Sequence, residues 1–133
     1  MPTREEVTAW INDYETAWRT AGTAGLADLF TPDATYSQGP YREPVVGLPA
    51  IAEMWEAERD GPDEVFTLRS DVFVDAGTRA VARIEVDYGD PVTTRFRDIW
   101  LMEFDEDGRV SHFEEWPFSS ERLHVAPPPH PAM

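Results

Sequence analysis

The sequence predicts an α+β fold in which one curved, mostly antiparallel sheet wraps over three helices. Up to about residue 58 the apolar side chains recur at helical spacing, whereas from Asp63 onward apolar and polar residues alternate. Short turns rich in Asp, Gly and Pro separate the alternating segments, a pattern typical of consecutive hairpins. Helices followed by a run of strands is the order of an α+β domain.

The first half of the chain supplies the helices. Thr3, followed by Glu5 and Glu6, is typical of an N-cap with an acidic first turn, and we expect the helix that it begins to span about 4–20. After the Gly-containing break TAGTAG comes a second short helix around LADLF. A third helix is expected from Leu48 to Glu58, which carries Ile51, Met54 and Trp55 at helical spacing.

The second half supplies a meander of four long strands. Before it, TYSQG is predicted to be a short strand, and PYREPVVG, with its two prolines, a loop or an edge strand. The four long strands are EVFTLRSDVFVD, TRAVARIEVDYG, VTTRFRDIWLMEFD and RVSHFEEWPF. Residues 1–120 then form one domain, and 121–133 form a proline-rich tail whose prolines prevent regular pairing.

Composition excludes several classes of function. The formal net charge of −15 repels phosphate and anionic lipid, so we expect neither nucleic acid nor a membrane surface as a partner. Cys is absent, which excludes disulfides and thiolate metal sites. No stretch approaches the roughly 20 apolar residues of a membrane span, and no signal peptide is evident, so a cytoplasmic location is expected.

Asp98 is a candidate for chemistry because of its neighbours. It lies between Phe96 and Trp100, on the side of its strand that also holds Met102, while the opposite side is apolar too. This indicates a central strand covered on two faces, where a carboxylate must be paired, hydrogen-bonded or neutral. A structural partnership with a nearby Arg or a helix N-terminus is the alternative to catalysis.

The DEDG turn leaves the register of the last hairpin open. A three-residue loop would place His112 and Glu114 on the side of Asp98, whereas a four-residue loop would place Phe113 and Glu115 there. One of the two glutamates therefore faces the concave side of the sheet. His112 lacks neighbours for a metal site, and no nucleotide-binding or Ser-hydrolase motif occurs, so we expect neither a metal nor an organic cofactor.

Three segments, YETAWRTAGTAGLADLFTPDATY, VVGLPAIAEMW and FDEDGRVSHFEEW, resemble the SnoaL-like, nuclear-transport-factor-2-like (NTF2-like) superfamily over about 4–118. The resemblance implies a cone of curved sheet and three helices enclosing an apolar pocket for a small, largely apolar organic ligand, and a homodimer. The superfamily includes isomerases, dehydratases, cyclases, epoxide hydrolases and binding proteins, so fold alone does not decide function. We expect the pocket wall to include Tyr14, Trp18, Trp55, Phe96, Trp100, Met102 and Phe113.

Ketosteroid isomerases and limonene-epoxide hydrolases make different predictions for the site. The isomerase resemblance matches a pocket tyrosine at Tyr14, but its base falls at Gln38 and its second acid falls near Trp100, two residues from Asp98. The hydrolase resemblance covers a Tyr-x-Asn pair, an Arg-x-Asp pair and an Asp on the last strand. Those positions are Tyr36, Gln38, Arg83, Glu85 and Glu115 here.

The hydrolase resemblance implies a defined division of roles. Glu115 would take a proton from water, Glu85 would protonate the epoxide oxygen, Arg83 would bridge them, and Tyr36 and Gln38 would hold the water. The strand AVARIEVDYG is equally typical of a half-exposed strand with these charges in solvent.

Three hypotheses therefore stand. The first is epoxide opening. The second is an isomerase, dehydratase or polyketide cyclase that uses Asp98 with Tyr14 or His112. The third is a binding protein without turnover.

Overall fold

The computed structural model describes residues 2–59, 61 and 63–120, and the predicted tail at 121–133 lies outside them. These described residues form three helices: α1 (Arg4–Trp18), α2 (Leu26–Leu29) and α3 (Leu48–Glu58). They also form six strands: β1 (Phe30–Ser37), β2 (Val45–Val46), β3 (Phe66–Ala76), β4 (Arg79–Tyr88), β5 (Thr94–Phe104) and β6 (Val110–Ser119). No helix among the described residues has the length and apolar character needed to span a membrane.

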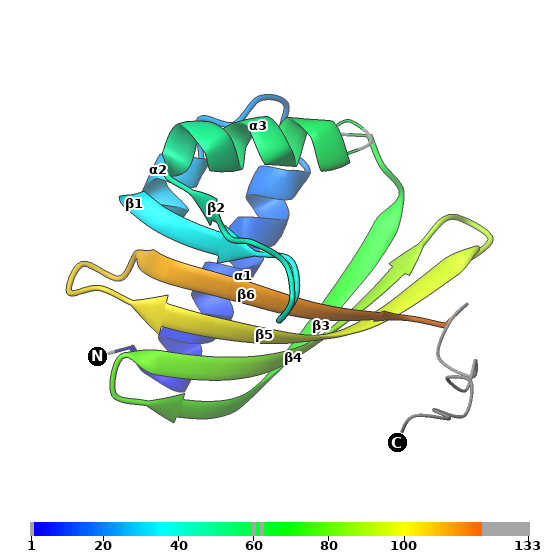
Figure 1. The fold of residues 1–133 in the computed structure, drawn as a ribbon. Coiled ribbons are helices and arrows are strands. Elements are labelled where there is room, and N and C mark those ends of the chain that lie inside the picture. Colours follow the sequence, from blue (N-terminus) through cyan, green and yellow to red (C-terminus); the bar gives the residue numbers. More distant parts are fainter. Residues whose placement is uncertain (1, 60, 62, 121–133) are drawn as a thin grey trace, which may run out of the picture.

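The strands form one curved sheet in the order β2-β1-β6-β5-β4-β3, and only the β1–β6 pair is parallel (Figure 1). The predicted α+β fold is confirmed, including the meander of consecutive antiparallel hairpins from β3 to β6. The strand around TYSQG is longer than predicted, because it begins directly after α2 at Phe30.

Local sequence explains where α1 begins. The Thr3 hydroxyl accepts a hydrogen bond from the Glu6 backbone N–H at 3.2 Å, and the Glu6 carboxylate accepts one from the Thr3 N–H at 3.0 Å. This reciprocal pair satisfies two backbone donors that a helix end otherwise leaves without a partner. The apolar stripe of α1, which includes Val7, Ile11 and Tyr14, faces the sheet.

The end of α1 is fixed by Arg59, which is 8% exposed. Its guanidinium donates hydrogen bonds to the carbonyl oxygens of Ala17, Trp18, Thr20 and Gly22 and also pairs with Glu56. These bonds use the carbonyl groups that a helix C-terminus leaves free. Arg59 thereby ties the break after α1 to the end of α3.

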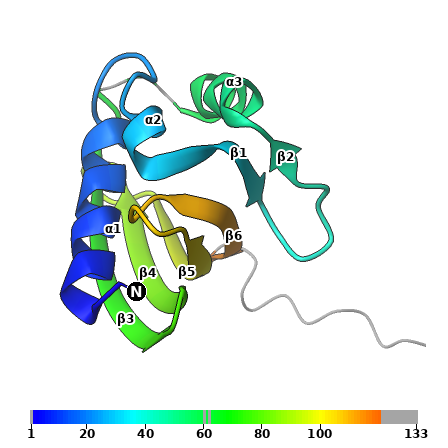
Figure 2. The same cartoon turned by 90° about the vertical axis from the view of Figure 1, so that its left-hand side faces the viewer.

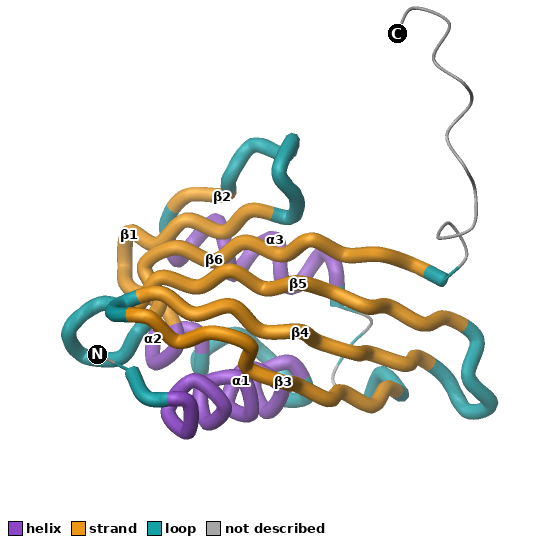
Figure 3. Tube along the Cα trace, turned by 90° about the horizontal axis from the view of Figure 1, so that it is seen from below, coloured by secondary structure: helices purple, strands orange, loops and turns teal. Residues whose placement is uncertain are grey.

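All three helices lie on one face of the sheet (Figures 2 and 3). The inward positions of the central strands are buried, including Ala82, Ile84, Trp100 and Met102. Strand β5 is central, as predicted, but the described residues cover only its inner face, so Ile99 and Leu101 on the outer face stay half-exposed. The expected homodimer stays a prediction.

An aromatic cluster fills the end of the cone where α2 meets β1. Trp10 packs on Phe30 with ring centroids 5.6 Å apart, and on Phe113 at 5.8 Å. Tyr14 packs on Phe113 from the next turn of α1, with centroids 5.6 Å apart. These rings fill the interior at this end of the sheet.

A β-bulge sets the register of the last hairpin. Phe104 pairs with Val110, but the residue before it on β5, Glu103, pairs with His112. Ser111, between Val110 and His112, is therefore an extra residue on β6. An extra residue reverses the face on which all later side chains lie. Beyond the bulge, Glu115 pairs with Trp100 and faces inward, whereas His112, Glu114 and Trp116 face outward.

Candidate active site

A cavity of about 320 Å³ opens at the end of the sheet where β1, β4 and β6 finish and β3 and β5 begin. Helix α1 and the last turns of α3 close it on the other side. The described residues that line it are Tyr14, Glu15, Trp18, Tyr36, Gln38, Arg42, Met54, Glu58, Glu64, Phe66, Leu68, Val86, Tyr88, Phe96, Asp98, Trp100, Glu115 and Pro117.

Asp98 is a buried carboxyl in the wall of this cavity. It is 7% exposed, and its Oδ1 atom has no hydrogen-bond partner among the described residues. Burial raises the pKa of Asp98 to about 6, and the neighbouring Trp100 has a smaller effect in the opposite direction. The predicted alternative of a structural ion pair is not found, because Arg95 and Arg97 pair with Asp87 on the outer face.

Glu115 ends a chain of two tyrosines. The Tyr14 and Tyr36 hydroxyls are 2.7 Å apart, and the Tyr36 hydroxyl donates to the Glu115 Oε1 atom at 3.5 Å. Both tyrosines are buried, and burial followed by the charge of Glu115 raises their pKa values well above the ordinary value. The two phenols are therefore neutral hydrogen-bonding groups at neutral pH.

The charge of Asp98 acts on Glu115 across the adjacent strand. Burial, the negative charge of Asp98 and the charge of Glu58 raise the pKa of Glu115 to about 8, while the hydrogen bond from Tyr36 lowers it. Two carboxyls in one desolvated pocket cannot both ionise easily. At pH 7 the cavity therefore holds a mostly ionised Asp98 beside a mostly protonated Glu115.

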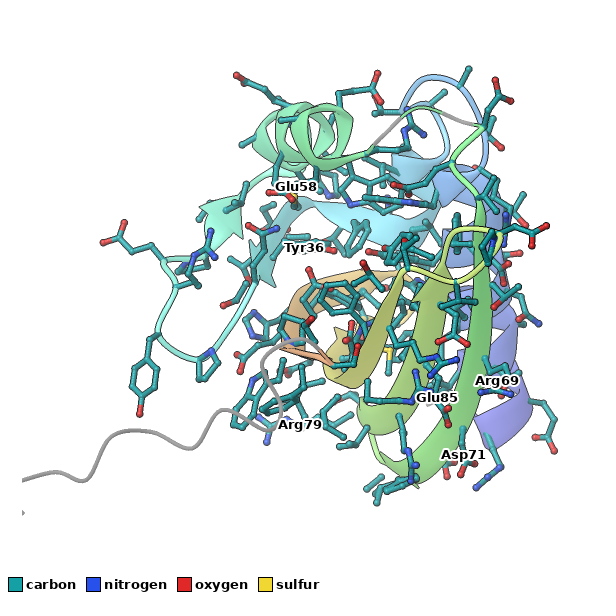
Figure 4. The ribbon with its side chains drawn as sticks, turned by 90° about the vertical axis from the view of Figure 1, so that its right-hand side faces the viewer. Tyr36, Glu58, Arg69, Asp71, Arg79 and Glu85 are labelled. Carbon is teal, nitrogen blue, oxygen red and sulfur yellow. The ribbon has the colours of Figure 1, made fainter. Side chains whose placement is uncertain are left out.

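The structure places Arg83 and Glu85 away from this cavity. The inward positions of β4 are Ala82, Ile84 and Val86, so the two charged residues between them face outward. There the carboxylate of Glu85 pairs with Arg69 at 2.9 Å and Arg97 at 3.1 Å, and Arg83 lies 3.9 Å from Glu85. Figure 4 shows Glu85 beside Arg69, well separated from Tyr36 and Glu58.

This placement corrects the catalytic interpretation of the RIE segment. The period of two along a strand explains the outcome: Ile84 fills the core, so its two neighbours must point to solvent. Without Arg83 and Glu85, the arrangement implied by limonene-epoxide hydrolases loses its acid and its bridging cation. Tyr36, Gln38 and Glu115 remain in the cavity wall, and Gln38 accepts a hydrogen bond from Arg42 at 3.5 Å.

Four of the seven expected wall residues, Tyr14, Trp18, Phe96 and Trp100, line the cavity. The other three, Trp55, Met102 and Phe113, are at most 2% exposed and lie in the core behind it. His112 faces outward next to Thr35 and Glu114, so it does not assist Asp98.

Sequence reasoning missed several lining residues, among them the titratable Glu58, Glu64 and Tyr88. Glu64 accepts a hydrogen bond from the Trp18 indole at 2.9 Å, and burial raises the pKa of Tyr88 to about 12. Each of the three lies at or beside the end of a helix or strand. No periodic pattern marks such positions, because the preceding element sets the direction of the side chain.

A larger groove of about 650 Å³ lies on the far side of α1, between the break after α1 and the turn at 105–108. Its carboxylates, such as Asp13, Asp28 and Glu106, are exposed, and none of them has the burial that separates Asp98 from solvent. We therefore place the candidate site in the smaller cavity. In the described part of the chain, no three His, Asp or Glu side chains are arranged to hold a metal ion.

Comparison with protein families identifies the chain. The model of the SnoaL-like domain matches residues 11–113, so the chain belongs to the SnoaL-like family. The comparison with curated proteins gave no match.

Solved structures share the fold at low sequence identity. A protein proposed to be a ketosteroid isomerase, from Kribbella flavida, is 20% identical with a TM-score of 0.67, over 96% of this chain and 85% of the other. A nuclear-transport-factor-2-like protein of unknown function from Mesorhizobium loti is 21% identical with a TM-score of 0.64, over 89% and 97%. A protein proposed to be a polyketide cyclase, from Sinorhizobium meliloti, is 21% identical with a TM-score of 0.60, over 81% and 94%. At this identity the likeness shows the fold alone.

Proposed function

We propose that this SnoaL-like domain is an acid–base enzyme that removes a proton next to the carbonyl group of a small, largely apolar molecule. The observation that carries the proposal is the pair of inward carboxyls, one with a buried oxygen that lacks a partner and one linked to two tyrosines. An isomerase and an aldol-type cyclase both begin with this step. The names of two structural relatives are in keeping with either reaction.

Asp98 is the base in this proposal. Its ionised carboxylate takes the proton from the carbon beside the carbonyl, and the electron pair of the broken C–H bond moves to the carbonyl oxygen as an enolate. A base works best when its pKa lies near the working pH, and burial brings the pKa of Asp98 to about 6. Asp98 lines the cavity, and in this proposal its carboxylate accepts that proton.

Glu115 is the acid. In its protonated form it donates a hydrogen bond to the developing enolate oxygen, and burial keeps that proton in place with a pKa of about 8. Tyr14 and Tyr36 act as positioning residues, because their hydrogen-bonded chain orients the carboxyl of Glu115. In an isomerase Asp98 then returns the proton to a different carbon. In a cyclase the enolate carbon attacks a second carbonyl of the same molecule as the first carbonyl re-forms, and the oxygen of the second carbonyl takes up the proton that Asp98 removed.

Epoxide opening through Arg83 and Glu85 is not proposed, because their side chains leave the cavity for ion pairs on the outer face. A binding protein without turnover is the second candidate. The aromatic wall favours it, since rings such as Trp18 and Phe96 bind apolar molecules without any chemistry.

Hydrogen–deuterium exchange in D₂O tests the proposal. Small ketones are incubated with the protein, and proton NMR follows the loss of the signal from the carbon beside the carbonyl. We expect exchange that Asp98→Asn slows by about a hundredfold or more and Glu115→Gln by about tenfold. Glu114→Gln, which removes the same charge on the outer face, should leave the rate unchanged.

A carbon NMR titration of the carboxyl groups tests the same proposal without a substrate. An Asp98 carboxyl that titrates near the ordinary value of about 4 would contradict its role as the tuned base. Titration near 6 together with ketone exchange that persists in Asp98→Asn would assign the chemistry to another group.

A further inference from the structure

The cavity of the candidate site carries an excess of negative charge. Among the described residues that line it, five are acidic, namely Glu15, Glu58, Glu64, Asp98 and Glu115, and one, Arg42, is basic. Arg19 neutralises Glu15 at 2.9 Å. The Arg42 guanidinium is directed to the Gln38 side chain at 3.5 Å rather than to a carboxylate.

Four of these carboxyls have no cationic partner in the described part of the chain. Glu64 and Glu115 accept hydrogen bonds only from neutral groups, the Trp18 indole and the Tyr36 phenol. Asp98, which is 7% exposed, leaves its Oδ1 atom without any donor. Asp98 lines the cavity, and a buried carboxyl oxygen without a donor marks a place where a ligand supplies the missing interaction.

Aromatic rings line the same cavity as these carboxyls. Tyr88 packs edge-on against Phe96 with centroids 5.8 Å apart, and its ring lies 5.9 Å from that of Phe66. Trp18 and Trp100 complete this part of the wall. The faces of aromatic rings attract organic cations, most strongly where water is excluded.

We propose that the cavity takes a protonated amine, whose ammonium group is held by Glu58 and Glu64 while its apolar body packs against the aromatic wall. Glu58 is exposed and Glu64 is half-buried, so these two carboxylates lie nearer to solvent than Asp98. Asp98 and Glu115 are thus left for the reacting end of the molecule. The inference rests on the proposed function, since it makes the substrate an amine-bearing carbonyl compound, but its test measures binding alone.

The charge of the whole molecule supports an amine ligand. At a formal net charge of −15 the protein attracts cations over long range and repels carboxylates and phosphates. The carboxyls that line the cavity add a local negative potential.

Calorimetric titration of the full chain at pH 7 and low salt tests the proposal with three probes of similar shape and different charge. These are phenethylamine, phenethyl alcohol and phenylacetate. We expect the amine to bind at least about tenfold more tightly than the alcohol, and phenylacetate to bind most weakly. Equal or tighter binding of the alcohol overturns the proposal.

Matched variants locate the ammonium group. Glu58→Gln and Glu64→Gln should each weaken amine binding by about three- to tenfold and leave alcohol binding unchanged. The control is Glu53→Gln, which removes the same charge from an exposed position of the same helix, outside the cavity. If Glu58→Gln and Glu64→Gln weaken amine binding no more than Glu53→Gln does, the assignment of the ammonium site is wrong.

Selective amine binding without ketone exchange supports the cation site and contradicts the proposed reaction. Ketone exchange dependent on Asp98, without amine selectivity, supports the reaction and overturns the cation site.

Discussion

Glu115 lies directly opposite Trp100 in the antiparallel pair of β5 and β6, on the same face of the sheet as Asp98 two residues along β5. This diagonal relationship brings two carboxyls to one cavity wall. Burial disfavours the ionisation of both carboxyls, and the negative charge of Asp98 further disfavours the ionisation of Glu115 because little water screens it. The pKa of Asp98 is therefore about 6 and that of Glu115 about 8.

Activity should show a bell-shaped pH profile. The proposed base must be ionised and the proposed acid protonated, so kcat/KM should rise through about pH 6 and fall through about pH 8. Rates of ketone exchange measured from pH 4 to pH 10 check this. Glu115→Gln should remove the fall on the alkaline side, because an amide does not ionise. A profile of Glu115→Gln that keeps the alkaline limb would show that another group causes it.

The same carboxyls should make the protein less stable as pH rises. Both pKa values are higher in the folded state than in an unfolded chain, so their contribution is fully present below pH 4 and is lost as pH rises through about 6 and about 8. At pH 9 we expect Glu115→Gln to increase the free energy of unfolding relative to wild type by roughly 2 kcal/mol. Urea denaturation at pH 5 and pH 9 measures the difference. A variant that is destabilised equally at both pH values would refute the burial of a charge at Glu115.

Tyr36 should be needed to orient the acid. Tyr36→Phe removes the hydroxyl that contacts both Tyr14 and Glu115, so we expect ketone exchange to fall by about tenfold and the alkaline limb to shift to higher pH. The shift follows because the hydrogen bond from Tyr36 lowers the pKa of Glu115. Tyr41→Phe is the control, since Tyr41 is fully exposed. An unchanged pH profile in Tyr36→Phe would mean that the hydroxyl does not act on Glu115.

Arg83 and Glu85 should be dispensable for activity. Their ion pairs lie on the outer face, so Arg83→Gln and Glu85→Gln are expected to change ketone exchange by less than about twofold and stability by less than about 1 kcal/mol. Exchange rates and urea midpoints of the two variants check this. A large loss of exchange with normal folding would restore the interpretation that these residues take part in catalysis.

The sequence alone determined the elements of the fold. The N-cap at Thr3, the helix from Leu48 to Glu58 and the four alternating strands are local patterns, and the structure confirms each of them. Asp98 was also recognisable, because a carboxylate between Phe96 and Trp100 on an apolar strand has to be buried.

Only the tertiary structure decided which side chains share the cavity. Strand periodicity makes Arg83 and Glu85 neighbours on one face, but which face is inward depends on what Ile84 packs against. The choice between Glu114 and Glu115 depended on the bulge at Ser111, a single extra residue that the turn sequence does not specify. Glu58 and Glu64 line the cavity because α3 ends beside it and the chain then enters β3 there. The physical reason is common to all three. Local sequence sets the spacing at which side chains share a face, whereas packing between distant segments decides which face is buried.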